Sequence, residues 1–510
     1  MPAADIVIKN ARIITMDAAR PDAGMVAIDG DSISFVGEES EIESWAGAGT
    51  RVIDGGGRTA APGFNDAHVH LFSLIRQLLS IDLSPASAGS IADIKEKIRE
   101  KAANTPPGTW ISGTGYNEFY LAEKRCPTRR DLDEVAPLNP VVLSHRSLHA
   151  CVLNSAALAL AGITAETEEP PGGRIERDLE TGEPNGILTG MVGYIRSQVM
   201  TPLTEEELGE GVKKAGRLLI ASGITSVQDA TVSNDLKRWE TVCGFVLNEQ
   251  LRSRVTLMAG APYWKNFREA GLTSGAGDNM MRLGAVKIMP AEPMDRAALN
   301  ELVLDIHKAG FQLAFHAVTE STVDAVIAAL ERTDGQAAVK GRRHRIEHCG
   351  ECPPYLLERI KKLGLVIVTQ PPFIYYNGER YLATVPESQQ PWLYRVKSPL
   401  GKGVTVAGSS DTPVVPVNPM VGVYAAVTRK AESGQVLLPE EAISPAEALK
   451  LYTVNGAYAS FEEKIKGSIT PGKLADIVVL SGDPRTVPPE EIKDIRVEMT
   501  IVGGRVVWEG

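Results

Sequence analysis

The sequence of 510 residues is poor in cysteine, has no excess of basic residues and contains no long apolar run. Five cysteines are too few for a disulfide framework. Lys and Arg number 53 against 64 for Asp and Glu, and this net charge of −11 argues against nucleic acid as the main partner. No apolar run is long enough to span a bilayer, and no secretory signal is visible at the N-terminus. We therefore expect a cytoplasmic protein with no membrane partner and no nucleic-acid partner.

Two of the cysteines, Cys349 and Cys352, form a C-x-x-C motif. This spacing is half of a structural zinc site and is also the spacing of a redox pair. The sequence holds no second C-x-x-C that would complete a zinc site. We therefore interpret these two residues as incidental thiols.

What is present is the composition of a globular protein, with 43% hydrophobic and 23% charged residues. Both ends of the chain contain short β-rich runs separated by Gly and Asp, as turns between antiparallel strands require. These runs are residues 5–16, 25–36, 50–54, 475–483 and 497–510. We expect residues 1–60 and 463–510 to pair into one small discontinuous β-sandwich.

The middle of the chain alternates short apolar runs with helical periodicity, which is the pattern of a parallel sheet in the α/β class. Eight runs read as strands: residues 63–70, 224–229, 254–259, 284–289, 311–317, 344–349, 365–370 and 404–411. Ser444, Pro445 and Glu447 form a capping box with Pro at the first helical position, and so predict a helix start. We expect residues 61–462 to form a TIM-like (β/α)8 barrel.

A ninth candidate strand, residues 140–145, is one too many for such a barrel. It lies in a gap of more than 150 residues between the first two barrel strands, and ordinary connections are far shorter. We therefore interpret residues 80–200, roughly, as an insertion that covers the barrel mouth.

The first chemical signal is the pair His68 and His70. Residues i and i+2 of a strand point to the same face, so two imidazoles project together from one strand end. A surface or hydrogen-bonded pair is the plain alternative. His316, His348 and Asp411 then end three later strands, and in an α/β barrel the strand C-termini gather at the face where active sites form. Several metal-compatible residues at different strand ends favour a metal site.

Two further histidines fit this pattern less well. His307 lies in an expected helix, and we interpret it as structural or exposed. His344 begins its strand, so we expect it at the end of the barrel opposite the metals.

Lys287 interrupts an apolar strand, where an ammonium group is costly unless it is neutralised or paired. One interpretation is a salt bridge to an inward carboxylate. The other is that the amine has reacted with carbon dioxide to give a carbamate that can bridge two metals.

Together these motifs resemble the amidohydrolase superfamily and, within it, the YtcJ-like branch (amidohydrolase 3). Beside Lys287, the resemblance rests on the runs GGGRTAAPGFNDAHVH, FHAVTEST, RHRIEHC, GSSDTP and GSITPGKLADIVVL. Residues 110–118, 127–158 and 171–188 look like that branch's insertion, so the match extends nearly from end to end. One difference concerns substrate class: relatives commonly have an aspartate-glycine stretch after the lysine, where this chain has Met289-Pro290-Ala291-Glu292.

The resemblance implies a (β/α)8 barrel with a small β-sandwich made from both termini. It implies His68 and His70 as ligands from the first strand and Lys287 as a bridging, carboxylated lysine. It assigns His316 and His348 to a second metal. Asp411 matches the ligand that also acts as the proton shuttle.

The ligand types suit zinc, although manganese, iron or cobalt also accept them, and we expect one or two divalent ions. Such a metal supplies hydroxide at neutral pH and polarises a carbonyl, and Asp411 can pass the proton to a leaving nitrogen. We therefore expect a metal-dependent hydrolase of a non-peptide C–N bond in a small molecule, such as an N-acyl or N-formyl amide.

The insertion is the expected source of substrate contacts. Trp110 and Tyr116 would form an aromatic wall with a polar tip. His145 and His149 would hydrogen-bond the substrate, and packing within the lid is an equal alternative for both. Arg174 follows two glycines and would pair with a substrate carboxylate.

Two other functions stay open from the sequence. The same metal site suits a deaminase, an ester or lactone hydrolase, or an isomerase. A non-catalytic binding protein on a retained barrel is the other alternative, against which the full ligand set argues. The substrate identity is open, as is the oligomeric state, with a homo-oligomer as one option.

Overall fold

The computed structural model describes residues 3–291, 293–333 and 339–510, and the chain divides into two compact units. The first unit is made of residues Met1–Leu71, Gly216–Pro290 and Asp295–Gly510. The second is made of residues Phe72–Ala215 and Ala291–Met294. Within the described part of the chain, no helix has the length and apolar character needed to cross a membrane.

The centre of the first unit is an eight-stranded parallel sheet, ordered β21-β20-β19-β18-β17-β16-β15-β8. An isolated parallel bridge between Val69 and Thr412 joins the two edges, so the sheet closes into the expected barrel. All eight expected strands are present. They are β8 (Phe64–Val69), β15 (Ile224–Asp229), β16 (Arg254–Gly260), β17 (Met281–Ile288), β18 (Leu313–Ala317), β19 (Arg345–His348), β20 (Val366–Thr369) and β21 (Val406–Gly408).

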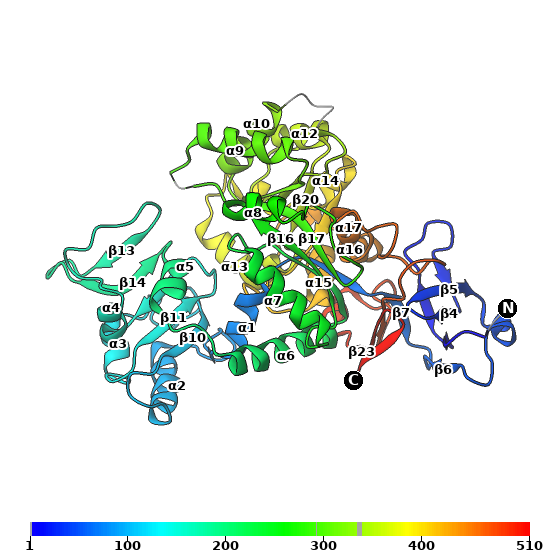
Figure 1. Cartoon of the computed structure of the whole chain (residues 1–510), viewed down its shortest axis with the longest axis horizontal. Coiled ribbons are helices and arrows are strands. Elements are labelled where there is room, and N and C mark those ends of the chain that lie inside the picture. The colour runs from blue at the N-terminus through cyan, green and yellow to red at the C-terminus, as the bar shows by residue number, and fades with distance from the viewer. Residues whose placement is uncertain (1–2, 292, 334–338) are drawn as a thin grey trace. The chain divides into compact units, whose positions relative to one another are not determined.

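Helices alternate with the barrel strands along the chain (Figure 1). In α10, the apolar positions Val323, Val326, Ile327 and Leu330 are all buried, as their helical spacing requires. The helices are α6 (Glu205–Ala221, which spans both units in sequence), α7 (Leu236–Leu247), α8 (Trp264–Glu269), α9 (Arg296–Lys308), α10 (Glu320–Glu331), α12 (Pro354–Leu363), α13 (Pro372–Thr384), α14 (Lys397–Gly401), α15 (Pro419–Thr428), α16 (Pro445–Leu451) and α17 (Val454–Ala459).

Two smaller sheets complete the first unit, and their facing apolar residues share one core. The four-stranded sheet contains β5 (Ser32–Gly37), β4 (Met25–Asp29), β1 (Ile6–Lys9) and β6 (Arg51–Asp54). The six-stranded sheet contains β24 (Arg505–Glu509), β23 (Val497–Val502), β22 (Ile477–Leu480), β7 (Thr59–Pro62), β2 (Arg12–Ile14) and β3 (Asp22–Ala23). Because β22 pairs with β7, the two ends of the chain meet in one sheet (Figure 1).

The second unit has its own sheet, ordered β13-β14-β12-β11-β10-β9. The ninth candidate strand of the sequence is β11 of this sheet and not a barrel strand. The strands are β9 (Ile81–Asp82), β10 (Ile111–Tyr116), β11 (Val141–His145), β12 (Ala150–Leu153), β13 (Arg174–Arg177) and β14 (Pro184–Thr189). The helices are α1 (Leu71–Leu78), α2 (Ile91–Ala103), α3 (Arg129–Asp133), α4 (Ser155–Leu160), α5 (Val192–Tyr194) and the π-helical turn η2 (Ile195–Val199).

Candidate metal centre

The six expected metal ligands lie in or just after barrel strands, toward their carboxyl ends. His68 is in β8 and His70 directly follows it; Lys287 is in β17, His316 in β18 and His348 at the end of β19. Asp411 lies three residues after β21. Because parallel strands end at the same rim of the barrel, residues that are distant in sequence share one site.

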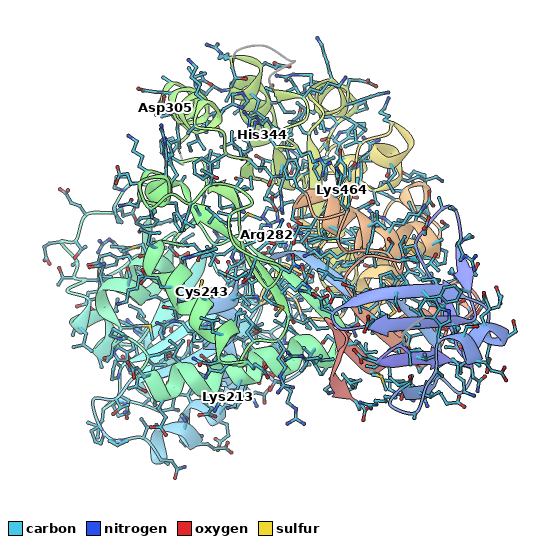
Figure 2. The ribbon with its side chains drawn as sticks, turned by 45° about the vertical axis from the view of Figure 1, so that its right-hand side comes forward. Lys213, Cys243, Arg282, Asp305, His344 and Lys464 are labelled. Atoms are coloured by element: carbon cyan, nitrogen blue, oxygen red, sulfur yellow. The ribbon has the colours of Figure 1, made fainter. Side chains whose placement is uncertain are left out.

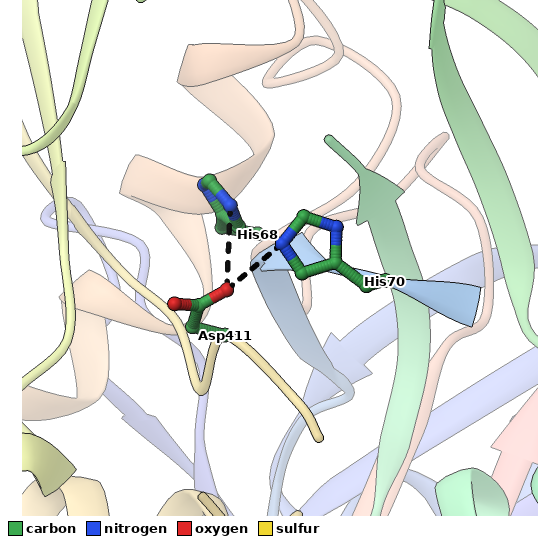
Figure 3. Close-up of side chains that lie close together, drawn as sticks. All are labelled: His68, His70 and Asp411. Atoms are coloured by element: carbon green, nitrogen blue, oxygen red, sulfur yellow. Dashed lines mark ion pairs between the residues drawn. The ribbon is translucent and has the colours of Figure 1, made fainter. Parts of the chain in front are cut away.

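Three of these residues form a tight cluster (Figure 3). Among the described residues, His68, His70 and Asp411 are the one group of three ligand-type side chains whose ligand atoms all lie within 4.8 Å of one another. Asp411 Oδ1 is 3.1 Å from His70 Nε2 and 3.5 Å from His68 Nε2. Despite this closeness, neither Asp411 Oδ1 nor His68 Nε2 makes a directed hydrogen bond, although both atoms are buried.

The orientation of His68 is fixed from the other side of its ring. His68 Nδ1 lies 2.6 Å from Glu347 Oε2, and a carboxylate oxygen is an acceptor, so Nδ1 carries the proton. The Nε2 lone pair therefore faces Asp411. Arg345 donates its Nε–H to Glu347 Oε1 over 2.7 Å, which compensates the buried negative charge of Glu347.

These contacts test whether a cation fits the site. A bare imidazole nitrogen and a carboxylate oxygen face each other in a buried space with no proton between them, so they repel unless a positive charge neutralises them. Imidazole nitrogen with carboxylate oxygen is a donor set typical of zinc and neighbouring transition metals. The residues present therefore fit a divalent metal.

A second pair of histidines lies beside this cluster. His348 Nε2 is 3.1 Å from His316 Nδ1, and the His348 and His68 rings have centroids 4.9 Å apart. His348 Nδ1 donates to Gln370 Oε1 over 2.9 Å, and Gln370 in turn donates to Ser409. His348 thus presents the lone pair of Nε2 toward His316, as a metal-binding histidine held by an outer partner does.

Lys287 is 1% exposed, and its Nζ has no hydrogen-bond partner. Burial lowers the pKa of its amine to about 8, against the raising effect of the Glu347 and Asp411 charges. The salt bridge considered as an alternative for this lysine is not present. No ion pair between the described residues includes Lys287. An amine with a lowered pKa is neutral more often than the amine of an exposed lysine is. The neutral amine is the form that reacts with carbon dioxide.

The charge states of the other residues follow from burial and from their neighbours. Burial lowers the pKa of His68 well below its ordinary value and also lowers that of His348, so both rings are neutral and able to act as ligands. Burial opposes ionisation of Asp411, but its interactions with the imidazole rings of His68, His70 and His348 outweigh burial and hold the Asp411 pKa below its ordinary value. Asp411 is therefore a carboxylate.

Two of the residues have strained backbones. His348 has a φ of 72° and Asp411 a φ of 58°, in the left-handed region that residues with a Cβ rarely adopt. Such conformations cost on the order of 1–3 kcal/mol and cluster at functional sites. The fold here stabilises a local geometry that places these two side chains at the site.

The expected substrate contacts all belong to the second unit. Tyr116 and His145 end neighbouring parallel strands, and their rings meet edge to face with centroids 5.3 Å apart. His145 Nε2 lies 3.1 Å from Glu118 Oε2, and this contact lowers the pKa of Glu118 to about 2. Trp110 packs against a different apolar cluster. His149 and Arg174 are exposed.

Sequence reasoning missed the residues that hold the ligands. Glu347 orients His68, Gln370 orients His348, and Thr231 Oγ1 lies 2.9 Å from His70 Nδ1. Glu347 could have been found from the sequence. It is a charged residue inside the strand run RHRIEHC, and the cost of burying a charge is the same argument that identified Lys287. Nothing in the sequence marks Gln370 or Thr231.

Three other sequence features are outside the expected ligand set. His344, which is labelled in Figure 2, is buried and is hydrogen-bonded over 2.9 Å to His307, which is also buried. Cys349 and Cys352 are buried free thiols. In the loop after Lys287, Glu292 lies outside the described residues.

Comparison with known proteins identifies full-length relatives. The sequence profile of the Amidohydrolase family matches residues 51–508. The N-substituted formamide deformylase of Arthrobacter pascens is 32% identical, over 99% of this chain and 98% of that protein. The Bacillus subtilis protein YtcJ is 27% identical over 92% of each chain.

A solved structure has the same fold. The crystal structure of an uncharacterized metal-dependent hydrolase from Pyrococcus furiosus superposes with a TM-score of 0.72 at 25% identity. The match covers 94% of this chain and 100% of that one.

Proposed function

Because this chain belongs to the amidohydrolase family, we propose that it is a metal-dependent hydrolase that cleaves a non-peptide carbon–nitrogen bond in an amide-type small molecule. The observation that carries this proposal is the buried convergence of His68 Nε2 and Asp411 Oδ1 without a proton between them. The full-length similarity to a formamide deformylase points to N-substituted formamides as the substrate class.

His68, His70 and Asp411 would hold one divalent ion, and His316 and His348 would hold a second. Zinc is the metal we propose, because imidazole and carboxylate ligands suit it. We further propose that the Lys287 amine forms a carbamate, releasing one proton as its nitrogen bonds to the carbon of carbon dioxide. The resulting carbamate would supply anionic oxygen ligands for the metal, which accounts for a buried Nζ with no partner.

Bound metal supplies Lewis acidity, which activates water near neutral pH and polarises the scissile carbonyl. The chain's own contribution to proton transfer is Asp411. Its Oδ1 faces His68 and His70, so its Oδ2 would accept a proton from the attacking water and deliver it to the leaving nitrogen. The lowered pKa of Asp411 keeps it in the carboxylate form that this role requires.

The test uses the full-length protein loaded with zinc and formanilide as the probe substrate. We expect equimolar aniline and formate, together with one or two metal ions per chain by elemental analysis. Asp411→Asn is expected to lower kcat on the order of 100- to 10,000-fold, the usual contribution of a general base. His68→Ala is expected to lose both metal and activity.

The matched control is Asp494→Asn, which removes a carboxylate whose side chain is 67% exposed and is expected to leave turnover unchanged. Separate assays for ammonia, amine and acid distinguish a deaminase or an ester or lactone hydrolase on the same metal site. Normal turnover by a metal-free Asp411→Asn protein would refute the proposal. The cytoplasmic location and the homo-oligomer considered from the sequence stay predictions.

A further inference from the structure

Arg196 in the second unit is a half-buried cation with an unusual set of partners. Its Nη2 donates to Ser144 Oγ over 3.2 Å and its Nη1 to Ser73 Oγ over 3.5 Å. Within the described residues, no carboxylate forms an ion pair with it. Partial burial, followed by the charge of Arg76, lowers the pKa of Arg196 to about 10, so the positive charge is partly desolvated and is not offset by its charged neighbour.

The three arginines that are fully buried in the described chain are all compensated. Arg345 pairs with Glu347, and Arg254 pairs with Asp476. Arg429 donates to three backbone carbonyl oxygens. Arg196 alone among these four is bonded only to hydroxyl groups, which carry no negative charge.

The hydroxyl partners differ from carbonyls in one important respect. A serine oxygen that accepts a hydrogen bond from Arg196 still has its own O–H to donate. The guanidinium has five N–H donors, of which two make the long bonds to Ser73 and Ser144. The cluster therefore presents donors and positive charge without an acceptor to match them.

The local backbone also sets this position apart. Arg196 lies in the π-helical turn η2, which directly continues α5. Such turns are rare and frequently occur at functional sites, because the wider turn re-aims one side chain. Ser73 comes from α1 and Ser144 from β11, so three separate elements bring these groups together.

We propose that Arg196, Ser73 and Ser144 form a binding site for the carboxylate group of a small molecule, with Arg76 adding to the positive field. A planar carboxylate would accept two N–H bonds from the guanidinium fork and O–H bonds from the two serines. All four residues belong to the second unit, so this proposal goes beyond the metal centre and stands apart from the reaction proposed for it.

The test measures acetate binding to the full-length zinc-loaded protein by calorimetry at constant ionic strength. Acetamide is the neutral control of the same shape. We expect acetate to bind and acetamide not to bind, with acetate affinity falling on the order of 10- to 100-fold in Arg196→Gln. The metal centre is intact in both proteins, so acetate that binds the metal contributes equally to each.

Two further variants keep the test decisive. Ser73→Ala retains the arginine and is expected to weaken acetate binding about threefold to tenfold. Arg99→Gln removes an exposed positive charge from the same unit and is expected to leave acetate affinity unchanged. Equal acetate affinity in wild type, Arg196→Gln and Ser73→Ala would overturn the proposal, and tighter binding of inorganic phosphate than of acetate would overturn the carboxylate assignment.

Thermal unfolding gives an independent readout. A partly desolvated charge without a counter-charge does not stabilise the folded chain, so Arg196→Gln in acetate-free buffer is expected to have an equal or higher Tm. Saturating acetate should raise the wild-type Tm by about 2 °C or more and leave that of Arg196→Gln unchanged. A clearly lower Tm for Arg196→Gln in acetate-free buffer would identify Arg196 as a structural residue and contradict the proposal.

Discussion

At the scale of single residues, the proposed metal centre depends on groups outside its expected ligand set. Glu347 accepts the Nδ1–H of His68 and is itself held by Arg345. This contact fixes both the tautomer and the ring orientation of His68. Outer partners of this kind raise the basicity of the ligand nitrogen and pre-set its direction.

Replacing Glu347 with glutamine tests this role. Glu347→Gln keeps the size of the side chain but exchanges a charged acceptor for a neutral amide, so His68 is less firmly held. We expect metal affinity to fall about 10- to 100-fold, measured by competition with a chelator. Activity should recover at high metal concentration, because the direct ligands are retained.

The control for this change is Glu358→Gln, at a position 57% exposed in α12. It should bind metal as the wild type does. Unaltered metal affinity in Glu347→Gln would show that His68 is oriented by packing alone.

At the scale of elements, a buried histidine pair joins α9 to the start of β19. Leu313 N donates to His344 Nδ1 over 3.0 Å, so Nδ1 is unprotonated and Nε2 carries the hydrogen. His344 Nε2 then donates to His307 Nδ1 over 2.9 Å. Protonation of His344 Nδ1 would place a hydrogen against the Leu313 N–H. Burial, with the charges of His307 and Arg342, lowers the pKa of His344 to about 3.

This lowered pKa predicts an acid sensitivity of folding. The folded pKa of about 3 lies below the unfolded value of about 6.5, so the unfolded chain binds a proton first as pH falls. The contribution of His344 to stability is thus complete above about pH 6.5 and is lost as pH falls from there toward 3.

His344→Asn removes the titrating group and keeps an acceptor for the Leu313 N–H. Between about pH 7 and about pH 5, the wild type is expected to lose about 2 kcal/mol more unfolding free energy than the variant, measured with urea. Exposed His149→Asn should follow the wild type. A variant with the same pH dependence as the wild type would contradict this account.

Much of this element-level structure could be predicted from the sequence. Each barrel strand is a short apolar run, buried on both faces, so local composition was sufficient to find all eight. The capping box at Ser444 was likewise confirmed, because Ser444 Oγ accepts from Glu447 N and Glu447 accepts from Ser444 N. These signals lie within a few residues of one another.

What the sequence could not supply depends on pairing between distant segments. The N-terminal strands divide between two sheets, with β2 and β7 joining the C-terminal strands and β1 joining β4. No local pattern distinguishes the two choices. The same holds at the site, where the metal-ligand residue types were visible but the roles of Thr231 and Gln370 require the barrel register that brings them to His70 and His348.

At the scale of the whole molecule, one buried ion pair connects the terminal sheets to the barrel. Arg254 begins β16 of the barrel, and Asp476 directly precedes β22 of the terminal sheet. The pair is bidentate, with Nε–Oδ2 at 2.7 Å and Nη2–Oδ1 at 2.8 Å, and the two side chains are 4% and 5% exposed. Asp476 Oδ1 also accepts from Gly503 N over 2.9 Å, so the carboxylate holds the β23–β24 turn as well.

Asp476→Asn is therefore expected to destabilise the first unit strongly. Removing one partner leaves the guanidinium of Arg254 buried without its counter-charge, which typically lowers the free energy of unfolding by about 3–5 kcal/mol. Because the pair links two sheets, calorimetry should show a lower Tm and a separate early transition as the terminal sheets lose their hold on the barrel. Hydrogen exchange should assign that transition to β22–β24.

The matched control is the exposed pair of Arg51 in β6 and Glu509 in β24, which joins the two terminal sheets to each other. Its N···O distance of 2.7 Å equals that of the buried pair, but the side chains are 54% and 53% exposed. Solvent screens such a pair, so Glu509→Gln should leave the Tm nearly unchanged. If the two variants changed the Tm equally, burial of the Arg254–Asp476 pair would not be what links the terminal sheets to the barrel. Apolar packing alone would then hold these sheets together.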